Sequence, residues 1–181
     1  MARLTSITSK DQVPANHQAA VESIIKSRGA IQGPFTMFLH APEAAERVAH
    51  LGAWVRFEGS LDKRVRVLAS MTVAREMDAM YVWSAQVGHA RKLNVPENTI
   101  SAILENHARG IPLEDAQIVE FTRALLRKHR VDDVTANALR ARFGDDEFVQ
   151  LTTAIGYYSL LAMTVNACEL EAAPGADVLP V

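Results

Sequence analysis

The sequence predicts an all-α protein, folded as a single domain of about eight helices over residues 1–181. Three observations lead to this prediction. Apolar residues recur at helical spacing in most segments of the chain. Prolines and glycines stand where such segments would begin and end. Strand signals are missing, because the sequence has no sustained apolar–polar alternation, no Asn-Gly turn and little clustering of β-branched residues.

The first third of the chain is expected to contain two helices. Pro14 and Pro42 suit helix starts, since proline lacks the N–H group that a first helical turn leaves without a partner, and Gly29 suits a helix end. The expected segments are a polar extended arm over 1–13, a helix over 16–27, a short apolar segment over 35–39 and a helix over 43–57.

The rest of the chain is organised around a pair of successive helices over 61–95 that meet near Asp78. Apolar residues lie along one face of the first helix and run through the second, so we expect any chemistry to lie against this pair. In the first helix these residues are Val65, Leu68, Ala69, Thr72 and Val73, and in the second Tyr81, Val82, Trp83, Ala85, Ala90 and Leu93.

The second half of the chain is expected to contain four helices and a tail. The helix that follows Pro112 begins with Glu114 and Asp115 and ends with Arg127 and Lys128, a charge order that the helix dipole favours. The expected segments are helices over 97–107, 113–129, 136–143 and 146–170, with a break at Gly144, and an irregular tail over 172–181.

Composition narrows the class of protein. Hydrophobic residues make up 49% of the chain and charged residues 22%, as in an ordinary globular protein. The net charge of -2 offers no positive excess for phosphates, so no nucleic-acid partner is expected. No apolar run reaches the ~18–20 residues of a membrane span, and no apolar signal core follows the start of the chain. We therefore expect a cytoplasmic protein with no membrane partner.

The central pair resembles the core of the carboxymuconolactone decarboxylase family, which includes the alkylhydroperoxidase D branch. Members that reduce peroxides carry a Cys-x-x-Cys-x-x-x-His motif with a proton-relay Glu upstream. Many members without the two cysteines carry Ala-x-Tyr-Glu-Trp-x-x-His instead. The matching run here is AMYVWSAQ over 79–86, in which Tyr81 and Trp83 fit the second pattern. Further stretches that resemble the Cys-less branch are GPFTMFLHAPEAAERV, RFEGSLDKR, AREMDAMYVW and IGYYSLLAMTVNA.

All four reactive positions of the family motif hold other residues here. The two cysteine positions are Ala79 and Val82, the histidine position is Gln86, and the glutamate position is Val67. The resemblance still implies an all-α fold, a small-molecule substrate, no cofactor, and association of the chain with itself as a dimer, trimer or hexamer.

The leading hypothesis is a cofactor-free lyase or isomerase that acts on a small carboxylated or lactone-like compound. Such an enzyme needs a cation for the substrate carboxylate and a group that moves a proton. The proposed proton-handling residues are Glu76, Gln86 and His89, and the proposed substrate-binding residues are Arg56, Arg75, Tyr81, Trp83 and His40. Each also fits a structural role, such as an ion pair at the helix junction for Arg75 and Glu76 or a core aromatic for Trp83.

Two other hypotheses belong to different classes. An alkylhydroperoxidase-like antioxidant protein would need Cys168 to react with an external thiol, because the chain has one cysteine. A non-catalytic, oligomeric ligand-binding protein would keep the fold and lose the chemistry. A metal enzyme is not expected, since no two of the six histidines have the i, i+4 spacing of a zinc-binding helix.

Overall fold

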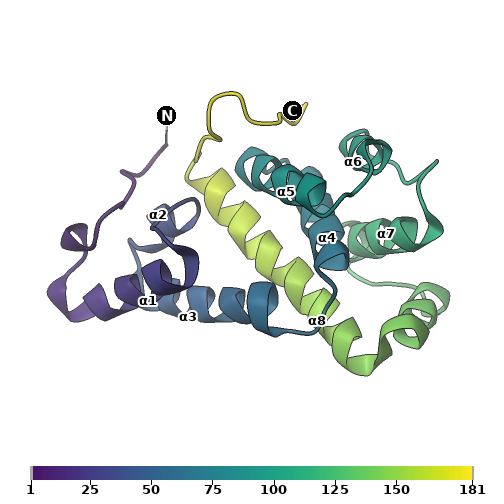
Figure 1. The fold of residues 1–181 in the computed structure, drawn as a ribbon, viewed down its shortest axis with the longest axis horizontal. Helices are drawn as coiled ribbons and strands as arrows, with labels where there is room; N and C mark the ends of the chain where they lie inside the picture. The colour runs from purple at the N-terminus through teal and green to yellow at the C-terminus, as the bar shows by residue number, and fades with distance from the viewer. Residues whose placement is uncertain (1, 181) are drawn as a thin grey trace. The chain divides into compact units, whose positions relative to one another are not determined.

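The computed structural model describes residues 2–180, and within that range all regular secondary structure is helical (Figure 1). The eight α-helices that the structure describes in residues 2–180 confirm the predicted fold class. They are α1 Gln18–Arg28, α2 Phe35–Phe38, α3 Pro42–Ala53, α4 Lys63–Glu76, α5 Met80–Lys92, α6 Glu97–Leu104, α7 Leu113–Lys128 and α8 Asp133–Ala167. Three short turns accompany them, the 3₁₀ turns η1 Lys10–Gln12 and η2 Ala15–His17 and the π-helical turn η3 Trp54–Glu58.

The chain forms two compact units. One contains the residues up to Gly59 together with Met163–Glu171, and the other contains Ser60–Ala162 together with the tail from Ala172. Helix α8 contributes residues to both units. That residues 1–181 form one domain stays a prediction.

The first unit is built on the packing of α1 and α2 against α3. Its core is apolar, with Val21, Ile24 and Leu39 almost fully buried. Arg28, the last residue of α1, ties the two longer helices together, because its Nη2 donates to the Ala49 carbonyl of α3 at 2.8 Å. Helix α3 passes directly into the π-helical turn, where the Gly59 N–H donates to the Trp54 carbonyl at 2.9 Å. The predicted helix over 43–57 therefore changes its geometry at residue 54.

The second unit is built around α4, which packs against α5, α6 and α7 (Figure 1). Asp62 caps α4, since its Oδ1 accepts from the N–H groups of Arg64 and Val65 at 2.8 and 3.2 Å. Every residue from Val67 to Ala74 is buried, so α4 is enclosed on all sides rather than along one stripe. The predicted junction is confirmed at Asp78, which turns the chain between α4 and α5 with a φ of 48°.

Helix α8 joins the two helices that the sequence predicts over 136–143 and 146–170. Gly144 is nonetheless a true break, because its φ of 72° and ψ of 174° are not helical. Within the second unit α8 is anchored by Gln150, whose Oε1 accepts from the Leu61 N–H at 3.0 Å and whose Nε2 donates to Ser60 at 3.0 Å. Phe121 of α7 also makes an edge-to-face contact with Phe148 of α8, so α7 packs against the same part of α8.

The tail is irregular, as predicted, and it lies against α5. Arg91 Nη1 donates to both carboxylate oxygens of Asp177, at 3.0 and 2.8 Å. The Leu179 N–H donates to the Met80 sulfur at 3.2 Å, and the Leu179 side chain is buried. The tail is thus attached near both ends of α5.

By length and composition α8 is apolar enough to cross a membrane, with a mean hydropathy of 1.3 over its most apolar stretch. Half of that stretch is buried inside the protein. Core helices of soluble proteins have the same properties, so this observation is weak evidence for a membrane.

Candidate functional site

The α4–α5 pair carries the four positions that correspond to the reactive residues of the resembling family. Val67 lies on α4, Ala79 stands immediately before α5, and Val82 and Gln86 lie on α5. All four side chains are buried. Three of them are apolar and cannot exchange a proton or attack a substrate.

Gln86 is held by a residue that sequence reasoning missed. The Ser70 hydroxyl lies 2.9 Å from Gln86 Oε1 and 2.9 Å from the Val67 carbonyl oxygen, so it can donate to either. Both side chains are buried, and neither titrates near neutral pH. The sequence position of Ser70 could have indicated this role, because Ser70 lies one turn after Val67 on a helix whose neighbouring residues are mostly apolar. A neutral hydroxyl–amide pair thus stands beside the family's glutamate and histidine positions.

The two aromatic residues of the matching run differ in burial. Trp83 is almost fully buried, and its Nε1 has no hydrogen-bond partner among residues 2–180. Tyr81 is partly buried, and this burial raises the pKa of its phenol above the usual 10.0. Trp83 is therefore a core aromatic of the second unit, whereas Tyr81 retains access to solvent.

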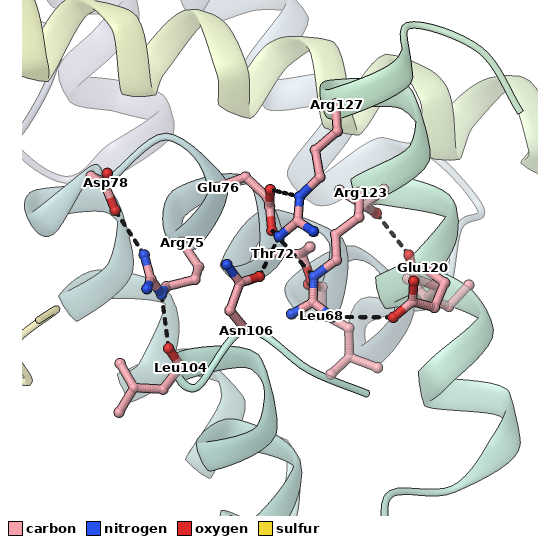
Figure 2. A network of polar contacts seen from close by, with 12 residues as sticks. Leu68, Thr72, Arg75, Glu76, Asp78, Leu104, Asn106, Glu120, Arg123 and Arg127 are labelled. Carbon is pink, nitrogen blue, oxygen red and sulfur yellow. Dashed lines mark hydrogen bonds and ion pairs between the residues drawn. The ribbon is translucent and has the colours of Figure 1, made fainter. Parts of the chain in front are cut away.

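Glu76 lies at the centre of a polar cluster at the end of α4 (Figure 2). Arg127 donates to both carboxylate oxygens, from Nε to Oε2 at 2.5 Å and from Nη2 to Oε1 at 2.6 Å. Arg123 Nε donates to Oε1 at 3.2 Å, and its Nη1 donates to Glu120 at 3.2 Å. The hydrogen bond to Glu76 raises the pKa of Arg127. Arg127 also donates to Asn106 Oδ1.

The burial of this cluster decides what Glu76 can do. The Glu76 side chain is 7% exposed and the Arg123 side chain 4%, whereas the Arg127 side chain is 48% exposed. Both oxygens of Glu76 already accept hydrogen bonds from guanidinium groups. This arrangement holds the end of α4 against α7 and leaves the carboxylate poorly placed to accept a proton from a substrate.

Arg75 points away from Glu76, although the two residues are neighbours in sequence (Figure 2). Its Nε donates to the Leu104 carbonyl at the end of α6 at 2.8 Å, and its Nη1 donates to Asp78 Oδ1 at 2.7 Å. The guanidinium is therefore fixed at the α4–α5 junction. Arg75 and Glu76 each form their ion pairs with other residues rather than with each other.

The remaining predicted residues lie in different places. His89 is exposed in the last turn of α5, three residues after Gln86. His40 and Arg56 belong to the first unit. The His40 Nε2 lies 2.9 Å from the Thr5 carbonyl oxygen, and the Arg56 guanidinium lies 4.9 Å from the centre of the Phe57 ring. The structure therefore describes the predicted residues in two units rather than as one constellation.

The first unit has an open surface depression of about 630 Å³ that sequence reasoning missed. It is lined from α1, α3 and the start of the π-helical turn by Ser23, Glu46, Arg47, His50, Leu51 and Trp54. None of the predicted site residues lines it. The sequence gives little indication of this depression, because charged residues at helical spacing on α3 are also typical of an ordinary solvent-exposed helix face.

The groups that bear on metal and thiol chemistry are the His, Asp and Glu side chains and Cys168. Within residues 2–180 no group of three His, Cys, Asp or Glu side chains is arranged to hold a metal ion. Cys168 is partly buried beyond the end of α8, where its carbonyl accepts from the Arg3 N–H at 2.8 Å. A single partly buried thiol lacks the resolving partner of a two-cysteine peroxidase.

Comparisons with known proteins show similarity at the level of structure. No family model matches the sequence, and no curated protein matches it. A crystal structure from Ralstonia eutropha JMP134, described as an alkylhydroperoxidase AhpD core and an uncharacterized peroxidase-related protein, matches with a TM-score of 0.78. It is 15% identical, and the match covers 96% of this chain and 93% of that one.

A second solved structure agrees. It is a protein of unknown function from Agrobacterium tumefaciens, described as a candidate antioxidant defence protein AhpD, with a TM-score of 0.67. It is 20% identical, and the match covers 78% of this chain and 99% of that one. At these identities the likeness establishes the fold, and the fold that the sequence resemblance implies is confirmed.

Proposed function

We propose that this chain, which has the alkylhydroperoxidase D-like fold, works without thiol chemistry as a cofactor-free lyase or isomerase on a small carboxylated or lactone-like compound. The proposal is supported by the residues that occupy the family's reactive positions on α4 and α5. Ala79 and Val82 are buried where thiols would stand, and Gln86 is bonded to Ser70. A reaction at this pair must therefore depend on proton transfer and electrostatic stabilisation.

Arg75 is the residue that we assign to the substrate carboxylate. Its guanidinium is held by Leu104 and Asp78, so its orientation is set before a substrate arrives. A cation that needs no reorganisation stabilises developing negative charge more effectively than a mobile one. Because Nε and Nη1 already donate to Leu104 and Asp78, the substrate carboxylate would bind at Nη2.

His89 is the residue that we assign to proton transfer. Imidazole is the side chain whose ordinary pKa lies closest to neutral pH. His89 lies in the last turn of α5 and its side chain is exposed, so a small compound can reach it. Gln86 lies one turn earlier and supplies a neutral polar group, whose orientation Ser70 fixes. Glu76 takes a positioning role, because Arg123 and Arg127 occupy both of its oxygens.

The test is a substrate screen with the full chain. Carboxylated lactones and β-keto acids are incubated in D₂O, and loss of the carboxylate or deuterium exchange at carbon is followed by proton NMR. We expect the wild type to turn over a member of this panel. His89→Asn should then lower kcat by about 10²–10⁴-fold, the usual contribution of a general acid or base. Arg75→Lys should raise KM, because a lysine ammonium cannot hold Leu104 and Asp78 in the same geometry and also reach the substrate carboxylate.

His107→Asn is the matched control, since His107 is a partly exposed histidine paired with Glu105 at 3.1 Å. It should leave both constants unchanged. The proposal is wrong if no member of the panel reacts, or if His89→Asn turns over substrate at the wild-type rate.

The description of both structural neighbours favours a second candidate, a peroxide-reducing protein. In this chain that activity would need Cys168 as the nucleophile. The test is consumption of tert-butyl hydroperoxide with dithiothreitol as the reductant, comparing the wild type with Cys168→Ser. Consumption that disappears in Cys168→Ser would replace the lyase proposal with the peroxidase.

A further inference from the structure

The surface depression of the first unit combines charged groups of both signs with an apolar wall. All of its lining residues belong to the first unit. Its volume of about 630 Å³ lies within the range of small-molecule sites, roughly 300–1,000 Å³. The lining offers a carboxylate, a guanidinium, an imidazole, a hydroxyl and two apolar side chains, from Glu46, Arg47, His50, Ser23, Leu51 and Trp54. None of these residues takes part in the proposed reaction, so the depression is a separate candidate site.

Helix α3 arranges five of these residues in two neighbouring rows. Glu46 and His50 are four residues apart, so they lie one above the other on the helix surface. Arg47, Leu51 and Trp54 form the second row, at intervals of four and three residues. The acid and the guanidinium are thus consecutive at one end, and the apolar groups follow toward the other end.

Contacts between α1 and α3 fix the two walls of the depression. Arg28 of α1 donates to the Ala49 carbonyl of α3 at 2.8 Å. Val21 and Ile24 of α1 are buried in the same apolar core as Ala45 and Ala49 of α3. The depression is therefore formed before a ligand arrives, which lowers the entropic cost of binding.

The polar groups of the depression are available to a ligand. Arg47 Nη1 donates to the Glu43 carbonyl at 2.8 Å and lies 3.8 Å from the Glu43 carboxylate. Within residues 2–180 no hydrogen bond uses Arg47 Nε or Nη2, the edge that binds a carboxylate through two parallel hydrogen bonds. In the same part of the chain the Glu46 and His50 side chains form no hydrogen bond or ion pair.

The charges favour a zwitterion over a simple anion or a simple cation. A carboxylate bound at Arg47 lies beside the like charge of Glu46, and an amine bound at Glu46 lies beside the like charge of Arg47. An α-amino acid carries both charges on one carbon and satisfies both residues. Leu51 and Trp54 stand about 6 and 10 Å further along the helix axis than Arg47, so they suit a large apolar side chain rather than a methyl group.

We infer that the depression binds a free α-amino acid with a large apolar side chain. Glu46 accepts hydrogen bonds from the ligand ammonium, and the Nε–Nη2 edge of Arg47 donates to the ligand carboxylate. Leu51 and Trp54 contact the ligand side chain, and aromatic ligands gain most from the indole ring. The inference concerns binding in the first unit and does not depend on the proposed reaction in the second.

The test is a titration of the full chain with L-phenylalanine, followed by NMR. The chain has two tryptophans, so the ¹⁵N-labelled protein gives two indole N–H signals, and Trp54→Phe identifies one of them by its loss. We expect a saturable shift of the Trp54 signal with a Kd of about 1 mM or lower, as for a ligand of this size at an open site. The Trp83 signal should not move, because Trp83 is almost fully buried in the second unit.

Two ligands that each lack one charge test the role of each residue. 3-Phenylpropionate has no ammonium and 2-phenylethylamine has no carboxylate, and both should bind at least about tenfold more weakly than L-phenylalanine. Glu46→Gln should weaken L-phenylalanine about tenfold without weakening 3-phenylpropionate. Arg47→Gln should weaken L-phenylalanine without weakening 2-phenylethylamine. Glu58→Gln is the matched control, because Glu58 is an exposed glutamate of the same unit that does not line the depression.

Arg75→Lys separates this site from the proposed reaction. Arg75 belongs to the second unit, so its substitution should leave the Trp54 titration unchanged. Three results would overturn the inference. They are a Trp54 signal that does not shift saturably up to about 10 mM L-phenylalanine, equal affinities for L-phenylalanine and 3-phenylpropionate, and a titration that neither Glu46→Gln nor Arg47→Gln changes. Equal affinities would assign the depression to simple carboxylates instead.

Discussion

Glu76 and Arg127 join α4 to α7 through two parallel hydrogen bonds, from Nε at 2.5 Å and from Nη2 at 2.6 Å (Figure 2). The buried guanidinium of Arg123 shares the same carboxylate. A charged group that sequence reasoning assigns to catalysis therefore holds helices together. This relationship determines how a substitution at Glu76 should be interpreted.

Glu76→Gln should destabilise the protein strongly. The amide keeps the shape of the side chain but removes the buried anion that faces Arg123, whose remaining carboxylate partner is the exposed Glu120, and removal of one partner from a buried ion pair costs about 3–5 kcal/mol. The measurement is the free energy of unfolding in urea. Glu105→Gln is the control, since its pair with His107 is more exposed and should contribute under about 1 kcal/mol. Equal effects of the two substitutions would contradict a buried ion-pair cluster.

Ser70→Ala should lower the free energy of unfolding, because Gln86 loses its hydroxyl partner. The substitution leaves a buried amide with one hydrogen bond fewer, which costs about 1–3 kcal/mol. Combining it with Gln86→Leu should cost less than the sum of the two single substitutions, because no polar group is then left without a partner. A double-mutant cycle measures this coupling. Additive effects would show that the two side chains do not interact in solution.

Gly144→Ala should destabilise the chain by about 1–3 kcal/mol, because a φ of 72° with a ψ of 174° is a region that essentially only glycine occupies. Gly156→Ala should instead stabilise the folded chain, because Gly156 lies within the helix and has open space around it. Thermal unfolding of both variants at low protein concentration distinguishes them. A stabilising effect of Gly144→Ala would rule out the break in α8.

Leu179→Ala should release the tail from α5. Leu179 is 3% exposed, and its N–H is bonded to Met80, so loss of its apolar contact removes one of the two attachments. Hydrogen exchange should then accelerate across residues 172–180 and leave α4 unchanged. Val178→Ala is the control, because Val178 is 69% exposed. Equal exchange rates in the two variants would mean that the tail is not attached through Leu179.

Tyr81 should contribute to a loss of stability in alkaline solution. Its pKa is raised by burial in the folded state, so the unfolded state releases the phenol proton first. The free energy of unfolding therefore falls as the pH rises through about 10 and is unaffected by this group below that range. Tyr81→Phe should flatten the decline between about pH 9 and pH 11. An unchanged slope would show that Tyr81 is solvated in the native protein.

The sequence was sufficient for the fold and for most helix boundaries. Proline and glycine at positions such as Pro42, Pro112 and Gly144 mark element ends because their backbone restrictions act locally. The junction at Asp78 followed from the change in apolar pattern. The enclosure of α4 was harder to predict, because it depends on which helices pack around it.

The candidate site was predicted less well, and the reason is physical. The partners of Glu76 are Arg123 and Arg127, which lie 47 and 51 residues away in the chain. No local pattern carries information about such pairs. Ser70 was missed for a different reason, since one hydroxyl among buried apolar residues has no periodic signal.

The proposed chemistry of this chain needs no thiol, and a comparison of the wild type with Cys168→Ser tests this point. Cys168→Ser is assayed in parallel with the wild type, with the carboxylated substrate that the screen identifies and with tert-butyl hydroperoxide. We expect Cys168→Ser to convert the carboxylated substrate at the wild-type rate, and we expect neither protein to consume the hydroperoxide. Hydroperoxide consumption by the wild type that Cys168→Ser abolishes would show instead that the chain works through its thiol.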